Sequence, residues 1–191
     1  IAAELKAVLS PQEQKLINAR LTENTAAYDL YLKGREIVRE NQFGFQRMQK
    51  QESLFQAAVA FDPKSAVAWP NLARVHANIY EQNSDHSTAR LEKATQAIET
   101  ALRLAPDFPE VIFEHGAYYY YGFRDYARAE ENFQQVARLQ PNNPEVISQL
   151  GALYRRMARW PEAEAAMRKA TQLDPGNYLA ATRFAGLLDA A

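Results

Sequence analysis

The side chains best suited to metal binding or acid–base catalysis are the three histidines of the sequence, His76, His86 and His115. No two of them have the i, i+4 spacing that places two metal ligands on one face of a helix. We expect His76 and His115 to lie on helices, where packing or an interhelical hydrogen bond is the usual role, and His86 to lie in a solvated loop. The histidines therefore predict neither a metal site nor a cofactor.

Carboxylates, hydroxyls and thiols give no catalytic pattern either. The neighbouring acids Glu130 and Glu131, and the spaced acids Glu162 and Glu164, fall on helices whose outer face we expect to be solvated. The sequence contains no glycine-rich phosphate loop and no nucleophile elbow. It contains no cysteine, which excludes disulfides and thiolate ligands. We therefore expect no catalytic residue, and a chain that is not an enzyme.

Tyrosines offer chemistry of another kind, the recognition of a partner. Residues 118–121 are four consecutive tyrosines, and on a helix they point in four directions about 100° apart. We expect Tyr119 to face the core, and Tyr120 and Tyr121 to share another side of the helix with Phe113. Tyrosine is amphipathic and frequent at interfaces, which favours contact with a ligand. The alternative is that Phe113 and the tyrosines fill wide gaps between neighbouring helices.

Basic and polar residues fall on the same helical side, which we call the inner face. Arginines that flank tyrosines favour a protein or peptide partner that is acidic or contains aromatic residues, through charge-assisted pairing and stacking. The alternative is that several arginines pair with Glu110 or Glu114. Together with Phe113, Tyr120 and Tyr121, the candidate partner-binding residues are Tyr31, Arg35, Arg39, Asn71, Arg74, Asn78, Arg155 and Arg156.

The helices that carry these residues end in a recurring way. A helical pattern closes on a proline at Pro63, Pro106, Pro141 and Pro175, at intervals of 43, 35 and 34 residues. A period in this range is typical of a solenoid of helix pairs, in which no repeat buries its own apolar face and stacked neighbours complete the core. The sequence therefore predicts an all-α solenoid, a fold that builds surfaces.

The clearest unit covers residues 144–177. Its first helix has an apolar stripe that includes Gly151, although glycine costs about 1 kcal/mol of helix propensity. We expect Gly151 to allow the second helix to approach closely through Ala163. Pro175 then ends the pair, because proline has no amide donor and disfavours helical geometry in the residue before it.

This order of residues, an apolar residue, Leu-Gly, Tyr, Ala, a large apolar residue, Ala and Pro, resembles the tetratricopeptide repeat. Earlier units show the same pattern with one extra residue in 109–141, an insertion around Asn83 in 66–106, and Gln51 in place of alanine in 27–63. The resemblance implies a right-handed α-solenoid of helix-turn-helix repeats.

The resemblance also sets the expected organisation and function. It implies a solenoid over residues 25–191 that ends in a terminal helix at 178–189, and a protein–protein interaction module that binds a partner segment in its concave groove. Chaperone-binding members of the family hold a terminal carboxylate with a clamp rich in lysine and asparagine on three successive first helices. Asn71 fits that role, but Glu110 and Glu114 would repel a carboxylate, so we do not expect chaperone tails as partners.

The segment from Leu9 to Gln14 and the stretch from Leu21 to Arg35 are similar to a junction in bacterial multidomain proteins. There a TolB-like segment passes into carboxy-terminal tetratricopeptide repeats. Those proteins often carry an amino-terminal adenylate or guanylate cyclase domain, or a winged-helix domain. The resemblance implies that residues 1–24 are a helical segment and connector, and that the chain is part of a larger bacterial regulatory protein. No cyclase or winged-helix residue is present here.

The expected terminal helix is unusually apolar. Leu179, Phe184 and Leu188 lie on it, and its only charges are Arg183 and Asp189. Terminal repeats normally have a polar outer face. An alternative function is therefore self-association, as a homodimer through this helix, or an intramolecular scaffold without a ligand of its own.

Composition excludes several classes of partner. With 22 basic and 23 acidic residues the net charge is −1, which gives no reason to expect binding to nucleic acid or to an anionic membrane. No apolar run approaches a membrane span, and no signal peptide is visible. These features and the lack of cysteine predict a cytoplasmic location. The start at Ile1, without methionine, suggests a piece of a longer or processed protein.

Overall fold

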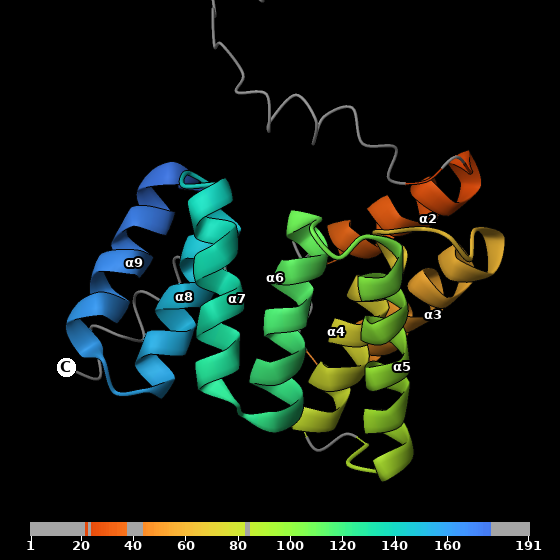
Figure 1. Ribbon diagram of the computed structural model, residues 1–191, viewed down its shortest axis with the longest axis horizontal. Helices are drawn as coiled ribbons and strands as arrows, with labels where there is room; N and C mark the ends of the chain where they lie inside the picture. Colours follow the sequence, from red (N-terminus) through yellow and green to blue (C-terminus); the bar gives the residue numbers. More distant parts are fainter. Residues whose placement is uncertain (1–21, 23, 38–43, 83–84, 177–191) are drawn as a thin grey trace, which may run out of the picture.

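The computed structural model describes residues 22, 24–37, 44–82 and 85–176. This part of the chain forms eight α-helices and no strand, which confirms the predicted all-α solenoid (Figure 1). The elements are α2 Thr25–Glu36, α3 Phe45–Phe61, α4 Ala68–Glu81, α5 Thr88–Leu104, α6 Pro109–Tyr118, the π-helical turn η1 Tyr119–Phe123, α7 Tyr126–Leu139, α8 Pro144–Arg156 and α9 Trp160–Leu173. The expected terminal helix and most of the expected segment 1–24 lie outside the described residues.

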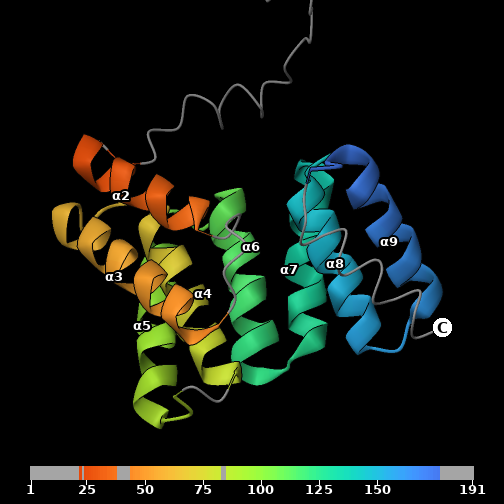
Figure 2. The ribbon, with the colours of Figure 1, turned by 180° about the vertical axis from the view of Figure 1, so that it is seen from behind.

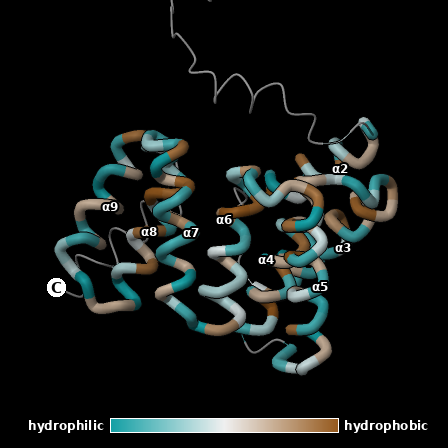
Figure 3. Tube along the Cα trace, in the orientation of Figure 1, coloured by the Kyte–Doolittle hydropathy of each residue, from teal (hydrophilic) through white to brown (hydrophobic). Residues whose placement is uncertain are grey.

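The helices pack as consecutive pairs, α2 with α3, α4 with α5, α6 with α7 and α8 with α9. Neighbouring pairs are joined mainly through α3 on α4, α4 on α6 and α7 on α8, and both ribbon views show the resulting row (Figure 2). Hydrophobic and hydrophilic residues alternate along each helix, as expected for helices that bury one stripe (Figure 3). The core therefore runs along the row between helices.

Several helices begin at a side chain that satisfies free backbone amides. Asn24, Ser87, Asp125 and Asn143 are N-caps whose side-chain oxygens accept hydrogen bonds from amides in the first turns of α2, α5, α7 and α8. Such caps typically stabilise a helix by about 1 kcal/mol. They fix the positions at which the first helices α2 and α8 start, and with them the residues of the inner face.

Three glycines, Gly34, Gly116 and Gly151, allow the helices of a pair to approach closely. A Cβ atom added to Gly151 would lie 2.7 Å from Cγ of Met167 and 3.3 Å from the backbone oxygen of Ala163, which confirms the predicted close contact. Gly34 holds the same relation to the ring of Phe55 in the first pair. The unexpected Gln51 is buried there and donates a hydrogen bond to the Gly34 carbonyl over 3.0 Å.

The extra residue of the 109–141 unit is absorbed in the π-helical turn η1. A π-turn is a one-residue insertion in a helix and shifts the phase of the residues that follow. Tyr118 and Tyr120 are therefore the buried tyrosines, each 7% exposed, whereas Tyr119 and Tyr121 are only partly buried. Tyr119 packs against the core, as predicted, although it is less completely buried than Tyr118 and Tyr120.

The π-turn also marks a change in how successive first helices meet. Within the described residues α4 packs directly on α6, but α6 has no comparable contact with α8. Tyr120 and Tyr121 fill one end of the resulting space, where they approach Arg156 and Gln149 over 3.3 and 3.5 Å. The other end, at the start of α6 and α8, is left as a pocket.

Candidate functional site

The inner face of the solenoid carries a cluster of polar and charged residues from all four first helices. Its members are defined here as the inner-face cluster: Tyr31 and Arg35 of α2, Asn71 and Arg74 of α4, Glu110 and Glu114 of α6, and Glu145 of α8. Because α2 contributes to contacts with α6 and α8, the cluster ties together helix pairs that are not neighbours along the solenoid.

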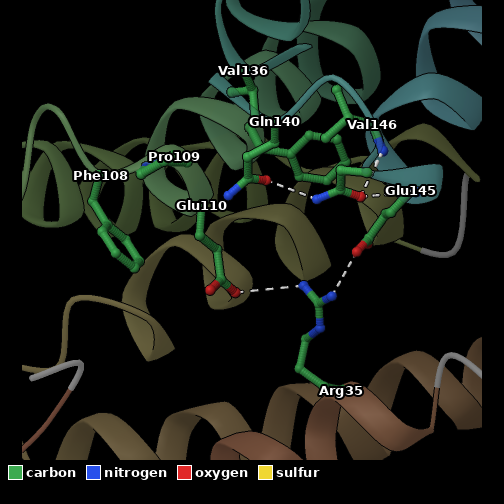
Figure 4. A pocket seen from close by; sticks show the side chains of 10 residues that line it. Arg35, Phe108, Pro109, Glu110, Val136, Gln140, Glu145 and Val146 are labelled. Carbon is green, nitrogen blue, oxygen red and sulfur yellow. Dashed lines mark hydrogen bonds and ion pairs between the residues drawn. The ribbon is translucent and has the colours of Figure 1, made fainter. Parts of the chain in front are cut away.

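Arg35 lies at the centre of this cluster. Its Nη2 donates a hydrogen bond to Glu145 Oε2 over 2.6 Å, and its Nη1 lies 3.4 Å from Glu110 Oε1 and 3.9 Å from Glu114 Oε1 (Figure 4). The side chain is 28% exposed. Burial disfavours the charged guanidinium, but Glu145, Glu110 and Glu114 outweigh it and raise the pKa of Arg35. Arg35 is thus a fixed cation between three glutamate side chains.

Glu110 is held by neutral donors as well as by Arg35. The Tyr31 hydroxyl donates to its carboxylate over 2.9 Å, and Asn71 Nδ2 donates to the same Oε1 over 2.7 Å. Asn71 Nδ2 also contacts the Val67 carbonyl within α4 at 2.8 Å. Burial raises the pKa of Glu110, although Arg35, Asn71 and Tyr31 oppose that shift. The same contacts raise the pKa of Tyr31, with burial as the largest cause and Glu110 next.

Glu114 is the most confined member of the cluster. Its side chain is 0% exposed, and Nε of Arg74 lies 3.2 Å from its Oε2. The angle at that contact does not make a hydrogen bond, so neither oxygen of Glu114 has a hydrogen-bond partner among the described residues. Burial raises its pKa to about 8, against the opposing effect of Arg74 and Arg35. A carboxyl with this pKa is mostly protonated at neutral pH.

A pocket of about 300 Å³ opens beside Arg35, where α6 and α8 do not meet. Figure 4 shows Arg35 on one side of it between Glu110 and Glu145, with Gln140 opposite. The lining residues are Arg35, Phe108, Pro109, Glu110, Phe113, Val136, Gln140, Asn143, Glu145 and Val146. The pocket therefore combines apolar walls with a charged rim, as ligand sites commonly do. We refer to it as the α6–α8 pocket.

The predicted inner-face residues have different surroundings in the structure. Tyr31, Arg35, Asn71 and Arg74 are brought together in the cluster, and Phe113 lines the α6–α8 pocket. The arginines pair with glutamates, as the alternative foresaw, so they no longer give a reason to expect an acidic partner.

The other predicted residues lie apart from the cluster. Tyr120 is buried, as the gap-filling alternative expected, and Asn78 and Tyr121 are partly buried. Arg155 and Arg156 are exposed, and Arg156 lies 3.7 Å from Glu81. Arg39 and the candidate self-association residues Leu179, Phe184 and Leu188 fall outside the described residues.

Sequence reasoning missed four residues of this region. Gln140 and Asn143 come from the turn between α7 and α8, and Glu145 from the first turn of α8. Only their place beside the Pro141 helix ending could have drawn attention to them. Arg47 of α3 is partly buried, and its Nε has no hydrogen-bond partner in the described part of the chain. Burial and the nearby charge of Arg74 lower the pKa of Arg47.

The histidines behave largely as expected. His76 is buried, and its Nδ1 lies 2.8 Å from Nη1 of Arg90 and 3.6 Å from Glu52. Burial lowers the pKa of His76 to about 4, so the ring is neutral and accepts from Arg90. His86 is not simply solvated, because it stacks on Tyr80 with ring centroids 3.8 Å apart. Within the described residues no group of three His, Asp or Glu side chains could hold a metal ion.

A second hollow of about 320 Å³ lies near the loop between α4 and α5. It is lined by Tyr80, Glu81, His86, Tyr121, Gly122, Phe123 and Arg124. Most of its aromatic rings already contact one another or their neighbours, since Tyr80 stacks on His86 and Tyr121 meets Tyr120 edge to face. This hollow is therefore lined largely by aromatic side chains that already pack on one another.

Comparison with known proteins supports the tetratricopeptide repeat. Residues 120–182 match the family model for that repeat. A thermophilic tetratricopeptide repeat protein of Thermus thermophilus superposes with a TM-score of 0.66 at 23% identity, over 93% of this chain and 87% of that one. The MamA protein superposes with a TM-score of 0.50 at 15% identity, over 87% and 81% of the two chains. No curated protein matches the sequence. These likenesses show the fold.

The fold indicates a general class of function. Chains built from tetratricopeptide repeats are generally non-catalytic scaffolds that bind other proteins. No helix among the described residues combines the length and apolarity needed to cross a membrane.

Proposed function

We propose that this chain is a protein-interaction scaffold that binds an extended segment of a partner protein along its inner face. The observation that carries the proposal is the α6–α8 pocket, an unfilled space on the inner face that residues of three helix pairs line together. Its walls are apolar and its rim is polar. Its volume of about 300 Å³ is at the lower limit for a small-molecule site and is large enough for one side chain of a partner protein.

The charged residues around the pocket support a role in recognition. Arg35 and Glu145 are both partly exposed, with side-chain exposures of 28% and 38%, so a partner can reach them without unfolding the chain. The exposed Arg155 and Arg156 lie further along α8 and extend the polar surface. Interfaces commonly combine an apolar anchor pocket with a polar rim of this kind.

The second part of the proposal concerns the context of the chain. The similarity of residues 9–35 to the junction after a TolB-like segment supports a place in a larger bacterial regulatory or signalling protein, with a cyclase as one candidate parent domain. In such a protein the solenoid would bring a partner to the regulatory domain and would itself stay non-catalytic. A cytoplasmic location goes with this part of the proposal.

Selection from a displayed library of random peptides tests the scaffold role directly. We expect enriched peptides whose binding weakens when Gln140→Trp fills the rim of the α6–α8 pocket. The matched control is Gln135→Trp, which places the same side chain on the exposed face of α7. If no peptide is enriched, or if both variants bind the selected peptides as well as the parent chain does, the proposal fails.

A further inference from the structure

Arg47 of α3 has no counter-ion among the described residues. It makes no ion pair and no side-chain hydrogen bond there, and its Nε is buried without a partner. A buried polar group ordinarily has such a partner, because leaving it unpaired costs free energy. The described part of the chain therefore leaves one guanidinium partly out of water and without compensation.

The charged groups near Arg47 do not supply that compensation. Burial lowers the pKa of Arg47, and the nearby positive charge of Arg74 lowers it further. Among the described residues only Tyr121 acts in the opposite direction, and no glutamate or aspartate contributes. A carboxylate beside Arg47 would offset both unfavourable effects.

Arg47 differs in this respect from the other arginines of the described chain. Each of those either pairs with a glutamate or aspartate or is exposed to water. The exposed arginines without an ion pair are Arg103, Arg124, Arg138 and Arg155. Water hydrates an exposed guanidinium, whereas it does not reach the Nε of Arg47. Arg47 is thus the unpaired arginine that gains most from an anion.

The rest of the inner face has no spare negative charge for Arg47. Burial raises the pKa of Glu114 to about 8, so its carboxyl is mostly protonated at neutral pH. The two other glutamates of the inner-face cluster then balance its two arginines, Arg35 and Arg74, which lie 2.6 and 3.8 Å from Glu145. Arg47 adds one positive charge beside Arg74. That excess matches a singly charged carboxylate better than a phosphate with two charges.

The end of the Arg47 side chain is accessible to a partner. The residue is only partly buried, and its two Nη atoms are neither buried nor bonded to a described residue. Two nitrogens of one guanidinium can hold both oxygens of a carboxylate through parallel hydrogen bonds. Tyr121 is a further donor, since its hydroxyl accepts from Gln149 over 3.5 Å and keeps its own proton for another acceptor.

We propose that Arg47 binds the side-chain carboxylate of an aspartate or glutamate in the bound partner segment, with Tyr121 beside it. This inference rests on the proposed scaffold function and names the chemistry of the partner. Tyr121 fills the end of the space between α6 and α8 that lies opposite the α6–α8 pocket, so one extended segment along this space would meet both sites. The arginines of the inner-face cluster keep their own glutamates in this arrangement.

The peptides selected on the parent chain provide the probe, made with an amidated carboxy terminus so that only side chains carry carboxylates. We expect them to share one acidic position. Replacing that aspartate or glutamate by asparagine or glutamine keeps the shape, removes the charge and should weaken binding about tenfold in fluorescence anisotropy. The same replacement at any other acidic position of the peptide is the matched control, and should change the affinity much less.

Variants of the chain test the site from its own side. Arg47→Gln should weaken binding of the acidic peptide about tenfold and leave the affinity of its amide version unchanged. Arg47→Lys keeps the charge and should restore part of the lost affinity. Arg138→Gln removes an equal charge from the exposed face of α7 and is the control for long-range attraction. Circular dichroism verifies that each variant is folded.

Arg47→Met tests the lack of a counter-ion without any ligand. Methionine keeps most of the stem and removes the charge. The urea midpoint should stay the same or rise, because no described carboxylate loses a partner. A clear fall of the midpoint would show that Arg47 is paired within the chain, and would overturn the proposed site.

The outcomes separate this inference from the function on which it rests. Peptides that bind, lose affinity in Gln140→Trp and share no acidic position would overturn the carboxylate and leave the scaffold standing. Equal effects of Arg47→Gln and Arg138→Gln would also overturn it. If the library yields no binder at all, the scaffold function fails and this inference falls with it.

Discussion

The guanidinium of Arg35 lies 2.6 Å from the carboxylate of Glu145, although 110 positions separate the two residues in the sequence. The contact joins the first helix of the first pair to the first helix of the fourth. Tyr31 makes a similar long-range contact with Glu110 at 2.9 Å. The inner face is therefore held by side chains that span the solenoid, in addition to the packing of neighbours.

Removing the charge of Arg35 should destabilise the fold. In Arg35→Gln the surrounding glutamates lose their shared cation, and we expect a loss of roughly 2 kcal/mol in the free energy of unfolding. The control is Arg168→Gln, whose ion pair with Glu164 is equally short at 2.6 Å but largely exposed. An exposed pair of that kind contributes about 0.5 kcal/mol. Urea unfolding followed by circular dichroism measures both, and equal losses would contradict the special role of Arg35.

Stability should fall as the pH rises from about 4.5 to 8. Burial raises the pKa of folded Glu114 to about 8 from an ordinary 4.5, so its contribution is fully present below pH 4.5 and is lost as the pH rises through 8. The raised pKa of Glu110 acts in the same direction. Urea midpoints between pH 6.5 and 8 measure the slope. Glu114→Gln should flatten it and Glu164→Gln should not, and an unchanged slope in Glu114→Gln would refute the assignment.

His76 should produce a separate loss of stability in acid. Because burial lowers its pKa to about 4 from an ordinary 6.5, the folded chain favours the neutral ring. The contribution of His76 is complete above pH 6.5 and is lost as the pH falls toward 4. His76→Gln should show a smaller loss than the parent chain over this range. The exposed His86 supplies the control, since His86→Gln should leave the acid slope as it is.

A glycine in the turn between α8 and α9 should stabilise the fold. Ala158 has a φ of 56°, in the left-handed region that residues with a Cβ adopt only at a cost. Ala158→Gly should therefore raise the free energy of unfolding by up to about 1 kcal/mol. Ala165→Gly, at an exposed position inside α9, should lower it by about as much. Destabilisation of similar size by both substitutions would show that the turn carries no strain.

Much of the fold could be predicted because it depends on local signals. The repeated proline endings and the glycine at position 151 indicate directly where the helix pairs lie. The interval from Pro106 to Pro141 is 35 residues, one more than the interval that follows it, and η1 accommodates that extra residue. The length of the interval alone did not show where in the unit the extra residue lies. The deeper burial of Tyr120 than of Tyr119 was therefore not predicted.

The candidate site was predictable only in part, for a different reason. Helical projection identifies which residues share the inner face, and it correctly grouped Arg35 with Arg74. It does not show how sharply the row of helices curves. That curvature brings Glu145 to Arg35, and the missing contact between α6 and α8 opens the pocket. Both features arise from packing between elements far apart in the sequence.

The contacts of α2 change the way in which this solenoid is expected to unfold. A repeat that touches only its neighbours can unfold from the end of the row while the rest stays folded. Here opening of α2 breaks the bonds of Tyr31 and Arg35 and leaves Glu110 and Glu145 without their partners in α2. Loss of the first helix pair therefore weakens the third and fourth, so that this end melts together with the middle of the chain and does not fray alone.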